Sequence, residues 1–495
     1  MRSSVVAVLV ALVLLGAACA GDVDGGAGGA LDGSPGTSAP PDAGSEEPTA
    51  TGSSTSATLA PLPPPSRIQL AGPQPGTATC PPVPAQSGPD PHRPVYDMEV
   101  EVLLDANAVV GRLTVRFRPD LTTDRLVFRL WPNGPRPAAA GASLEAGPVL
   151  VGAAAAATSQ PDPTTLVVSL QAAVGPGEEV EATVPWRLTL PGASNDRLAR
   201  EGETVRLGSF FPILAWEPGL GWATEPATSA FGESSTAPVA DFTYSVTVPE
   251  GLSVVASGAF DGSRWRAEAM RDVAVSVGRF RTAEAVAHAP SPVAVTVAVD
   301  ERLDDDAGAY LDRVVGALED FSRRFGAYPY ATHSLALTPG LSGGIEYPGH
   351  VMQGPGTLGR TTPHEVGHMW FYNVVGNNQG RDPWLDEGLA SWAEARYEGR
   401  LEEFRARTVP AYARGRAGEP MTFWENRQDG YYRGVYVQGA QALAALGDPD
   451  RVDCALRLYV AANSFTVARP ADLVMALRQV LPAAEATLAD FGVFP

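Results

Sequence analysis

The chain has 495 residues, a formal net charge of −20 at pH 7 and a hydrophobic content of 44%. This length allows two or three domains with sizeable cores. The strong negative charge argues against nucleic acid or an anionic membrane surface as a partner. The sequence therefore predicts a multidomain folded protein that binds no nucleic acid.

Residues 1–19 have the pattern of a secretory signal peptide. A basic residue precedes the apolar run Val5–Leu15, which is too short to span a bilayer unaided. The run ends in Gly16-Ala17-Ala18-Cys19, which resembles a bacterial lipobox, in which the cysteine is lipidated and becomes the new N-terminus. We therefore expect a protein outside the cytoplasm that is anchored to the cell membrane through lipid on Cys19. The alternative is ordinary cleavage after Ala20, which gives a secreted protein.

Residues 20–93 are rich in Gly, Pro, Ser, Thr and Ala, and they lack the apolar side chains needed for a core. We expect a disordered stalk between the anchor and the folded domains. The chain has 3 cysteines, so lipidation of Cys19 leaves Cys80 and Cys454. An even pair in an oxidising compartment predicts a disulfide between them, with two unpaired thiols as the alternative.

The folded part of the chain has two patterns. Over residues 94–286, short runs that alternate apolar and polar residues are separated by turns, which predicts an antiparallel β-sandwich or saddle-shaped sheet. A strand at Val293–Val299 and a helix at Asp304–Phe325 then begin a second domain, over residues 287–400. Residues 401–495 form a helical remainder of that domain. The predicted fold is multidomain α+β.

Two histidines spaced by four residues mark the candidate site of the second domain. On a helix, His364 and His368 stack on one face and can share a metal ion, with Glu365 close enough to reach a bound water. We expect this helix to run from about Pro363 to Gly376. A second helix carries Glu387 as a third ligand, and Glu394 lies two turns further on, where it can orient a ligand histidine. Two histidines, one glutamate and an open fourth position are typical of a hydrolytic zinc site.

A helix with two solvated histidines is the alternative, and the apolar residues Val366 and Met369–Phe371 argue against it because they predict a buried helix. The stretch resembles the aminopeptidase N family of gluzincin metallopeptidases, whose signature is His-Glu-x-x-His, eighteen residues and a Glu. Gly343–Pro348 is similar to the family's Gly-x-Met-Glu-Asn exopeptidase motif, with Ile345 and Tyr347 in place of Met and Asn. The resemblance runs from about Tyr96 to the C-terminus.

The resemblance implies a thermolysin-like catalytic domain with one Zn²⁺ and peptide substrates. It makes Glu365 the general base, and Glu346 the group that binds the substrate's free ammonium. Gly343 and Gly344 lie on an edge strand with which a peptide can pair closely. The segment Tyr436-Val-Gln-Gly-Ala matches the family's oxyanion tyrosine, which makes Tyr436 a stronger candidate than Tyr432.

Three functions compete at this point. The first is an aminopeptidase that removes N-terminal residues. The second is a zinc endopeptidase on the same scaffold, which the altered exopeptidase motif favours. The third is a catalytically silent surface-binding protein, against which the intact set of ligands, base and tyrosine argues. The family's β domain also lends a residue to the substrate's amino end; here the stretch Phe210–Pro218 is the candidate region, without a single residue to name.

Overall fold

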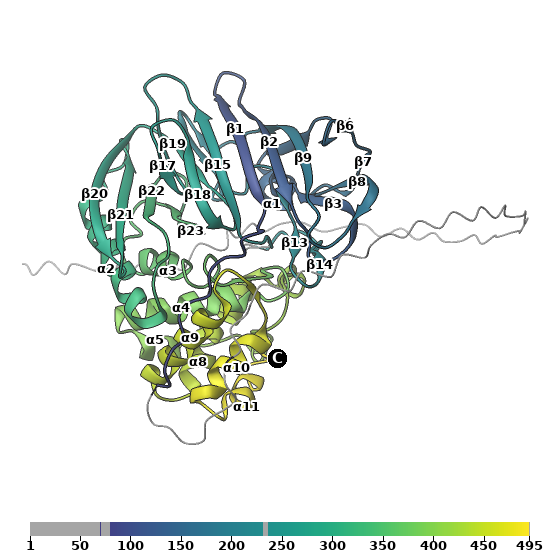
Figure 1. The fold of residues 1–495 in the computed structure, drawn as a ribbon. Coiled ribbons are helices and arrows are strands. Elements are labelled where there is room, and N and C mark those ends of the chain that lie inside the picture. The colour runs from purple at the N-terminus through teal and green to yellow at the C-terminus, as the bar shows by residue number, and fades with distance from the viewer. Residues whose placement is uncertain (1–69, 71–79, 231–235, 495) are drawn as a thin grey trace, which may run out of the picture.

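The computed structural model describes residues 70, 80–230 and 236–494, which form a β-rich half above a helical half (Figure 1). The β-rich half comes from the N-terminal part of the chain and the helical half from the C-terminal part. This arrangement confirms the predicted α+β class. The predicted signal peptide, Cys19 and the predicted stalk up to residue 79, apart from Leu70, lie outside the described residues. Within the described part of the chain, no helix combines the length and the apolar character needed to cross a membrane.

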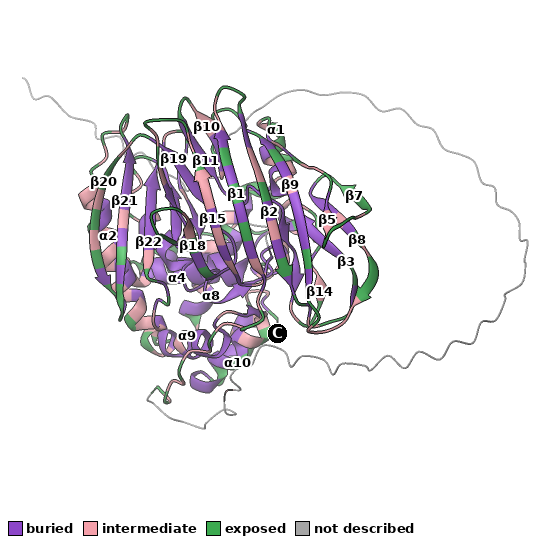
Figure 2. Ribbon diagram, turned by 45° about the horizontal axis from the view of Figure 1, so that its top comes forward, coloured by how far each residue is buried: buried purple, intermediate pink, exposed green. Residues whose placement is uncertain are grey.

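A nine-stranded sheet forms one layer of the β-rich half, with exposed and buried residues alternating along its strands (Figure 2). Along β1, Tyr96, Met98, Val100 and Val102 are buried and their neighbours face outward, as expected of a strand with one solvated face. The order is β17-β18-β15-β1-β2-β9-β5-β6, with β4 beside β9. The strands of this sheet pair antiparallel as predicted, with one exception: β1 runs parallel to β15. The strands are β1 (Val95–Leu103), β2 (Ala108–Phe117), β4 (Ser143–Ala146), β5 (Leu150–Val151), β6 (Ala154–Ala155), β9 (Val180–Thr189), β15 (Ala240–Thr247), β17 (Ala259–Phe260) and β18 (Trp265–Met270).

Smaller sheets pack against this layer through an aromatic core. The ring of Tyr96 stacks on Phe242 at 4.6 Å and meets Phe211 edge-on at 6.2 Å, while Phe210 meets Trp186 at 5.9 Å. Each such pair adds roughly 0.5–1.5 kcal/mol beyond the burial of its apolar surface. The remaining elements are β10 (Leu198–Glu201), β11 (Thr204–Leu207), β16 (Ser253–Ala256) and β19 (Val275–Gly278) in one sheet; β3 (Thr123–Arg129), β7 (Thr158–Asp162), β8 (Thr165–Val174) and β12 (Ile213–Leu214) in another; β13 (Trp216–Glu217) and β14 (Gly221–Trp222) in a third; and the short helices η1 (Trp131–Asn133) and α1 (Pro135–Ala139).

A five-stranded sheet of order β20-β21-β22-β24-β23 begins the second domain. The predicted boundary after residue 286 falls inside β20, which pairs along its whole length with β21. The boundary therefore lies near residue 280 instead. The prediction missed it because the alternation of residues along one strand does not show which sheet that strand joins. β23 lies at the edge of the sheet, as predicted. The strands are β20 (Phe280–His288), β21 (Pro292–Asp300), β22 (Thr332–Leu337), β23 (Gly344–Tyr347) and β24 (His350–Gln353).

Helix α2 follows β21 and shows why these residues form a helix. Asp306 caps it by accepting a hydrogen bond from the amide of Gly308 at 2.9 Å, and Arg323 and Arg324 lie in its last turn, where a positive charge favours the helix dipole. The helices of this half are α2 (Ala307–Phe325), α3 (Thr361–Gly367), α4 (Trp384–Glu398), α5 (Leu401–Ala406), α6 (Met421–Trp424), α7 (Gln428–Tyr431), the π-helical turn η2 (Tyr432–Val437), α8 (Gln438–Ala445), α9 (Pro449–Asn463), α10 (Pro470–Val480) and α11 (Ala484–Ala489), with a two-stranded ladder of β25 (Gly376–Asn377) and β26 (Val467–Ala468).

Helix α3 is shorter than its sequence predicts. It ends at Gly367, whereas the predicted helix reached Gly376. The next residues turn back, with the amide of Asn373 donating to the carbonyl of His368 at 3.0 Å, before β25 pairs with β26. The backbone N–H and C=O groups of β25 form their hydrogen bonds with β26, about ninety residues later, instead of within a longer helix. A local sequence pattern cannot show a partner so far away in the chain.

Residues 80–93 contradict the predicted disordered stalk, which was expected to reach residue 93. Gln86 Nε2 donates to the carbonyl of Ala327 at 3.3 Å, and Arg93 forms an ion pair with Asp241 at 2.7 Å. The segment therefore lies on both halves of the protein. Its Pro-rich composition disfavours helix and sheet, but extended backbone can still bind to a folded surface.

A disulfide joins Cys80 at the start of this segment to Cys454 in α9, across a sequence separation of 374 residues. We expect Cys454→Ser to lower the melting temperature, because closing so long a loop stabilises a folded chain by at most about 5 kcal/mol on the entropic model. Reductant should lower the melting temperature of the wild type and leave that of the variant unchanged. Peptide mapping without reductant provides the direct check. Two freely alkylated thiols in protein made in an oxidising compartment would contradict the pairing.

Candidate active site

Close helix packing brings the predicted ligands together. Gly388 of α4 and Gly439 of α8 touch backbone to backbone, since a Cβ added at Gly439 would lie 2.6 Å from the Cα of Gly388. Similarly, a Cβ at Gly367 of α3 would lie 3.2 Å from the Cβ of Ala393 in α4. Glycine at these positions removes the side chains that would hold the helices apart. As a result, α3, α4 and α8 converge on one buried site.

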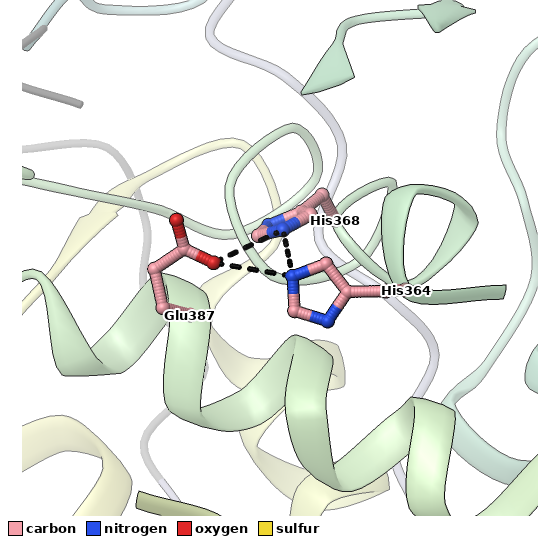
Figure 3. Close-up of side chains that lie close together, drawn as sticks. All are labelled: His364, His368 and Glu387. Atoms are coloured by element: carbon pink, nitrogen blue, oxygen red, sulfur yellow. Dashed lines mark hydrogen bonds and ion pairs between the residues drawn. The ribbon is translucent and has the colours of Figure 1, made fainter. Parts of the chain in front are cut away.

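The three predicted ligands meet at this site (Figure 3). The Nε2 atoms of His364 and His368 lie 3.2 Å apart, and Glu387 Oε2 lies 3.2 Å from the first and 3.4 Å from the second. A tetrahedral zinc with bonds of about 2.0–2.1 Å requires ligand atoms about 3.3–3.4 Å apart. The donor set therefore fits a zinc ion in both chemistry and spacing.

The charges around the two histidines also favour a cation between them. Burial lowers the pKa of His364, but hydrogen bonds to Glu387 and Glu394 outweigh burial and raise it to about 9. Burial raises the pKa of Glu387, but its contacts with both histidines outweigh that effect and lower it to about 2. A divalent metal supplies the positive charge that these buried carboxylates otherwise draw from protons.

Each ligand histidine has a carboxylate behind it. His368 Nδ1 donates to Asp386 Oδ1 at 2.6 Å, which leaves Nε2 to face the metal position. Gln379 Nε2 donates to the other oxygen of Asp386 at 2.5 Å. Sequence reasoning did not identify Asp386 or Gln379. The available signal was Asp386 directly before the ligand Glu387, among the apolar residues Trp384, Leu385 and Leu389. A carboxylate buried among such residues needs a partner.

Glu394 lies behind the other histidine, at the position where its spacing from Glu387 places it. Its Oε2 is 3.4 Å from His364 Nδ1, and its Oε1 accepts a hydrogen bond from Arg360 Nε at 2.5 Å. Arg360 was also not identified from the sequence. Its ion pair fixes the carboxylate of Glu394 beside the histidine ring.

The predicted base and the predicted amine ligand lie next to the metal position. Carboxylate oxygens of Glu346 and Glu365 lie with a ring nitrogen of His368 in a group whose atoms are all within 4.8 Å of one another. Burial raises the pKa of Glu365 to about 7, although both histidines oppose the shift. A group with a pKa near the working pH is suited to general acid–base catalysis.

Gly344 lies directly over Glu365. A Cβ at Gly344 would come within 2.4 Å of the carboxyl group of Glu365, so only glycine fits between the edge strand and the base. Gly343 precedes β23, and its carbonyl accepts a hydrogen bond from the amide of Gly354 at 2.8 Å. The sequence predicted that these glycines admit a substrate backbone. The structure adds that Gly344 makes room for Glu365.

Tyr436 lies at the site and Tyr432 lies beside it. The hydroxyl of Tyr436 donates to Glu387 Oε1 at 2.5 Å, and its ring stacks on that of His364 at 5.6 Å. It belongs to the π-helical turn η2, a distortion frequent at functional sites. The hydroxyl of Tyr432 accepts a hydrogen bond from Arg407 at 2.7 Å. The geometry therefore favours Tyr436 as the group that faces the metal position.

In the stretch Phe210–Pro218, Glu217 is the charged residue, and it forms an ion pair with Arg381 at 2.9 Å. The Glu217 carboxylate also lies 3.3 Å from the Asn378 side chain, just before α4. Its charge is thus matched by an arginine. Glu217 joins the two halves of the molecule near the start of the ligand-bearing helix.

Two histidines, a glutamate, a buried second glutamate and a tyrosine on this α+β fold are the arrangement expected of a zinc metallopeptidase of the gluzincin class. Residues 357–491 match the Peptidase family M1 domain. The structure resembles that of the M1 zinc metallopeptidase from Deinococcus radiodurans, with a TM-score of 0.60 and 19% identity over 82% of this chain and 96% of that one. A mutant of the Deinococcus enzyme with a Tyr-Ser-Ala substrate gives a TM-score of 0.61 at 19% identity, over 83% of this chain and 97% of that one.

Two curated proteins are similar over a short stretch of sequence. Leukotriene A-4 hydrolase of Xenopus laevis is 34% identical over 90 residues, which cover 16% of this chain and 15% of that protein. Probable M1 family aminopeptidase 2 of Encephalitozoon cuniculi (strain GB-M1) is 34% identical over 77 residues, or 16% of this chain and 8% of that protein. Residues 357–491 in the helical half thus match an M1 peptidase domain, which confirms the resemblance to aminopeptidase N-like gluzincins, and the chain aligns with only a small part of the curated relatives' length.

Proposed function

We propose that this protein is an aminopeptidase that uses one Zn²⁺, held by His364, His368 and Glu387, to remove N-terminal residues from peptides. The observation that supports an exopeptidase is the position of Glu346. Its buried carboxylate lies on the edge strand, with an oxygen within 4.8 Å of a carboxylate oxygen of the base Glu365. A peptide paired along β23 brings its amino end to Glu346 and its first peptide bond to the metal position.

The residues divide the chemistry among them. When bound, zinc polarises the scissile carbonyl and lowers the pKa of the attacking water. Glu365 accepts the proton of that water and then donates a proton to the leaving amine. The hydroxyl of Tyr436 stabilises the negative charge that develops on the carbonyl oxygen. Glu346 holds the substrate's ammonium group, which fixes the distance from the amino end to the bond that is cut.

The test compares a peptide that has a free amine with its N-acetylated twin. The wild type should strongly prefer the free amine, and Glu346→Ala should lose most of that preference. A charge-assisted contact of about 1.5–3 kcal/mol corresponds to roughly ten- to a hundredfold in kcat/KM. Wild type that cuts both peptides equally, or cuts blocked chains internally, would instead establish the endopeptidase. If neither peptide is hydrolysed in a chelator-sensitive reaction, both peptidase functions are excluded, and the catalytically silent surface-binding protein is the remaining alternative.

We further propose that the protein acts outside the cytoplasm and is attached to the cell membrane by a lipid anchor at Cys19. The signal-like N-terminus and the Cys80–Cys454 disulfide support this location, because disulfides persist in oxidising compartments. Mass spectrometry of the mature N-terminus distinguishes a lipidated Cys19 from a chain that is cleaved after Ala20.

A further inference from the structure

The two faces of the edge strand β23 contact different parts of the protein. Gly344 and Glu346 point to the metal site, where they meet Glu365 and His368. Because side chains alternate along a strand, Ile345 and Tyr347 point the other way. They form a small apolar cluster with Leu341, Met352 and Ala274, the last of which belongs to the β-rich half. The back face of β23 therefore rests on the N-terminal half of the protein.

A buried chain of hydrogen bonds extends this contact. The Tyr347 hydroxyl lies 3.2 Å from Ser209 Oγ, which donates to Asp272 Oδ2 at 2.9 Å. Since the serine proton points to the carboxylate, the tyrosine hydroxyl is the donor to Ser209. The other oxygen of Asp272 accepts from the amide of Val273 at 2.7 Å. Ser209, Asp272 and Tyr347 are each at most 3% exposed.

The backbone around Ser209 is shaped to receive this tyrosine. A Cβ at Gly208 would lie 2.3 Å from the Tyr347 hydroxyl oxygen, so the ring lies directly against the glycine. Ser209 itself has a φ of 48°, in the left-handed region that a non-glycine residue adopts at a cost of about 1–3 kcal/mol. Strain of this kind persists only where surrounding contacts maintain it. Here those contacts include the bonds to Asp272 and Tyr347.

The neighbouring strand has a separate attachment. His350 in β24 is paired with Tyr347 across the ladder, and its Nε2 lies 2.9 Å from Ser276 Oγ in β19. The inner strand is thus fixed to the β-rich half without Tyr347. Among the described strands β23 pairs with β24 alone, so its outer position depends on that ladder and on its back face.

We infer that Ser209 and Asp272 are positioning residues that hold Glu346 in register with the metal site through the Tyr347 hydroxyl. The β-rich half then takes part in recognition of the substrate's amino end by placing the strand that carries Glu346. This inference rests on the proposed aminopeptidase function, because it assigns a role to the residues behind Glu346. It also assigns a role to Tyr347, which stands where the family motif has Asn: its hydroxyl links the edge strand to Ser209.

The test measures kcat/KM for the free-amine peptide and its N-acetylated twin in Tyr347→Phe and Ser209→Ala. Each variant should reduce the ratio of the two values by about five- to tenfold, as expected when one positioning hydrogen bond is lost. Most of the loss should appear with the free-amine peptide, while zinc content stays at the wild-type level. The control is Tyr330→Phe, which removes a buried hydroxyl that bonds to the carbonyl of Ala269 at 3.0 Å. It should leave the ratio unchanged.

The outcomes separate this inference from the proposed function. If the wild type shows no preference for the free amine, the aminopeptidase proposal fails, and the role given to Ser209 and Asp272 fails with it. If the wild type has the preference and both variants retain it, the positioning role alone is overturned. Equal losses on both peptides, together with a lower melting temperature, would show a purely structural contact and would also overturn it. Ser209→Ala breaks the same chain of hydrogen bonds from the β-rich half and leaves Tyr347 itself unchanged, so it tests the inference if Tyr347→Phe does not fold.

Discussion

Glu365→Gln is expected to lower kcat by about a hundred- to ten-thousandfold while zinc remains bound. Glutamine preserves the shape of the side chain but cannot accept the proton of the attacking water. Glu365 is not one of the three donor groups that meet at 3.2–3.4 Å, so the metal site itself should be intact. Peptide hydrolysis and elemental analysis of the same preparation provide the measurement.

His364→Ala and Glu387→Ala are the matched comparison, because each removes a donor atom and should therefore lose the zinc itself. Zinc should raise the melting temperature of the wild type and of Glu365→Gln, and have little effect on the ligand variants, since a ligand that binds only the folded state stabilises it. A Glu365→Gln protein with near-normal turnover would disprove the assigned mechanism.

Gly344→Ala should be nearly as damaging, although it changes neither a ligand nor a charged group. A methyl group would lie 2.4 Å from the carboxyl group of Glu365, so either the base or the edge strand must move. Because a displacement of about 1 Å in a catalytic geometry can cost about a hundredfold, we expect a drop in kcat of that order. Zinc content should remain normal. Steady-state kinetics and metal analysis check both statements.

The control for Gly344→Ala is Gly359→Ala, because an added Cβ at Gly359 meets nothing within 4 Å. This glycine lies just before α3, so it tests the effect of a methyl group near the same site. If Gly344→Ala retains wild-type kcat, the contact between the edge strand and Glu365 does not matter for turnover. Loss of zinc in that variant would instead indicate that the whole site had been disturbed.

The sequence by itself determined the ligand set and its chemistry. His364 and His368 are four residues apart at the end of one helix, and Glu387 lies in the first turn of the next helix, so short-range geometry is enough to bring their side chains near each other. Periodicity also gave the correct class of structure for the β domain, but it did not show that β20 joins the next sheet or that β1 pairs in parallel with β15. Periods and spacings report on local conformation, and these features depend on little else.

Only the tertiary structure decided how distant segments meet. Gln379 reaches Asp386 because α3 ends at Gly367 and the chain turns back to pair with β26. Tyr347 meets Ser209 across 138 residues of sequence, and Cys80 meets Cys454 across 374. For Tyr347 and Ser209, neither residue carries a pattern that points to the other, because such contacts are selected by the packing of whole surfaces. The two cysteines could be paired from the sequence by their number, but the sequence did not show where in the fold they meet. For that reason the sequence indicates which residues hold the metal and that Glu394 can orient a ligand histidine, whereas only the fold shows the further groups that hold these residues in place, Asp386, Gln379 and Arg360.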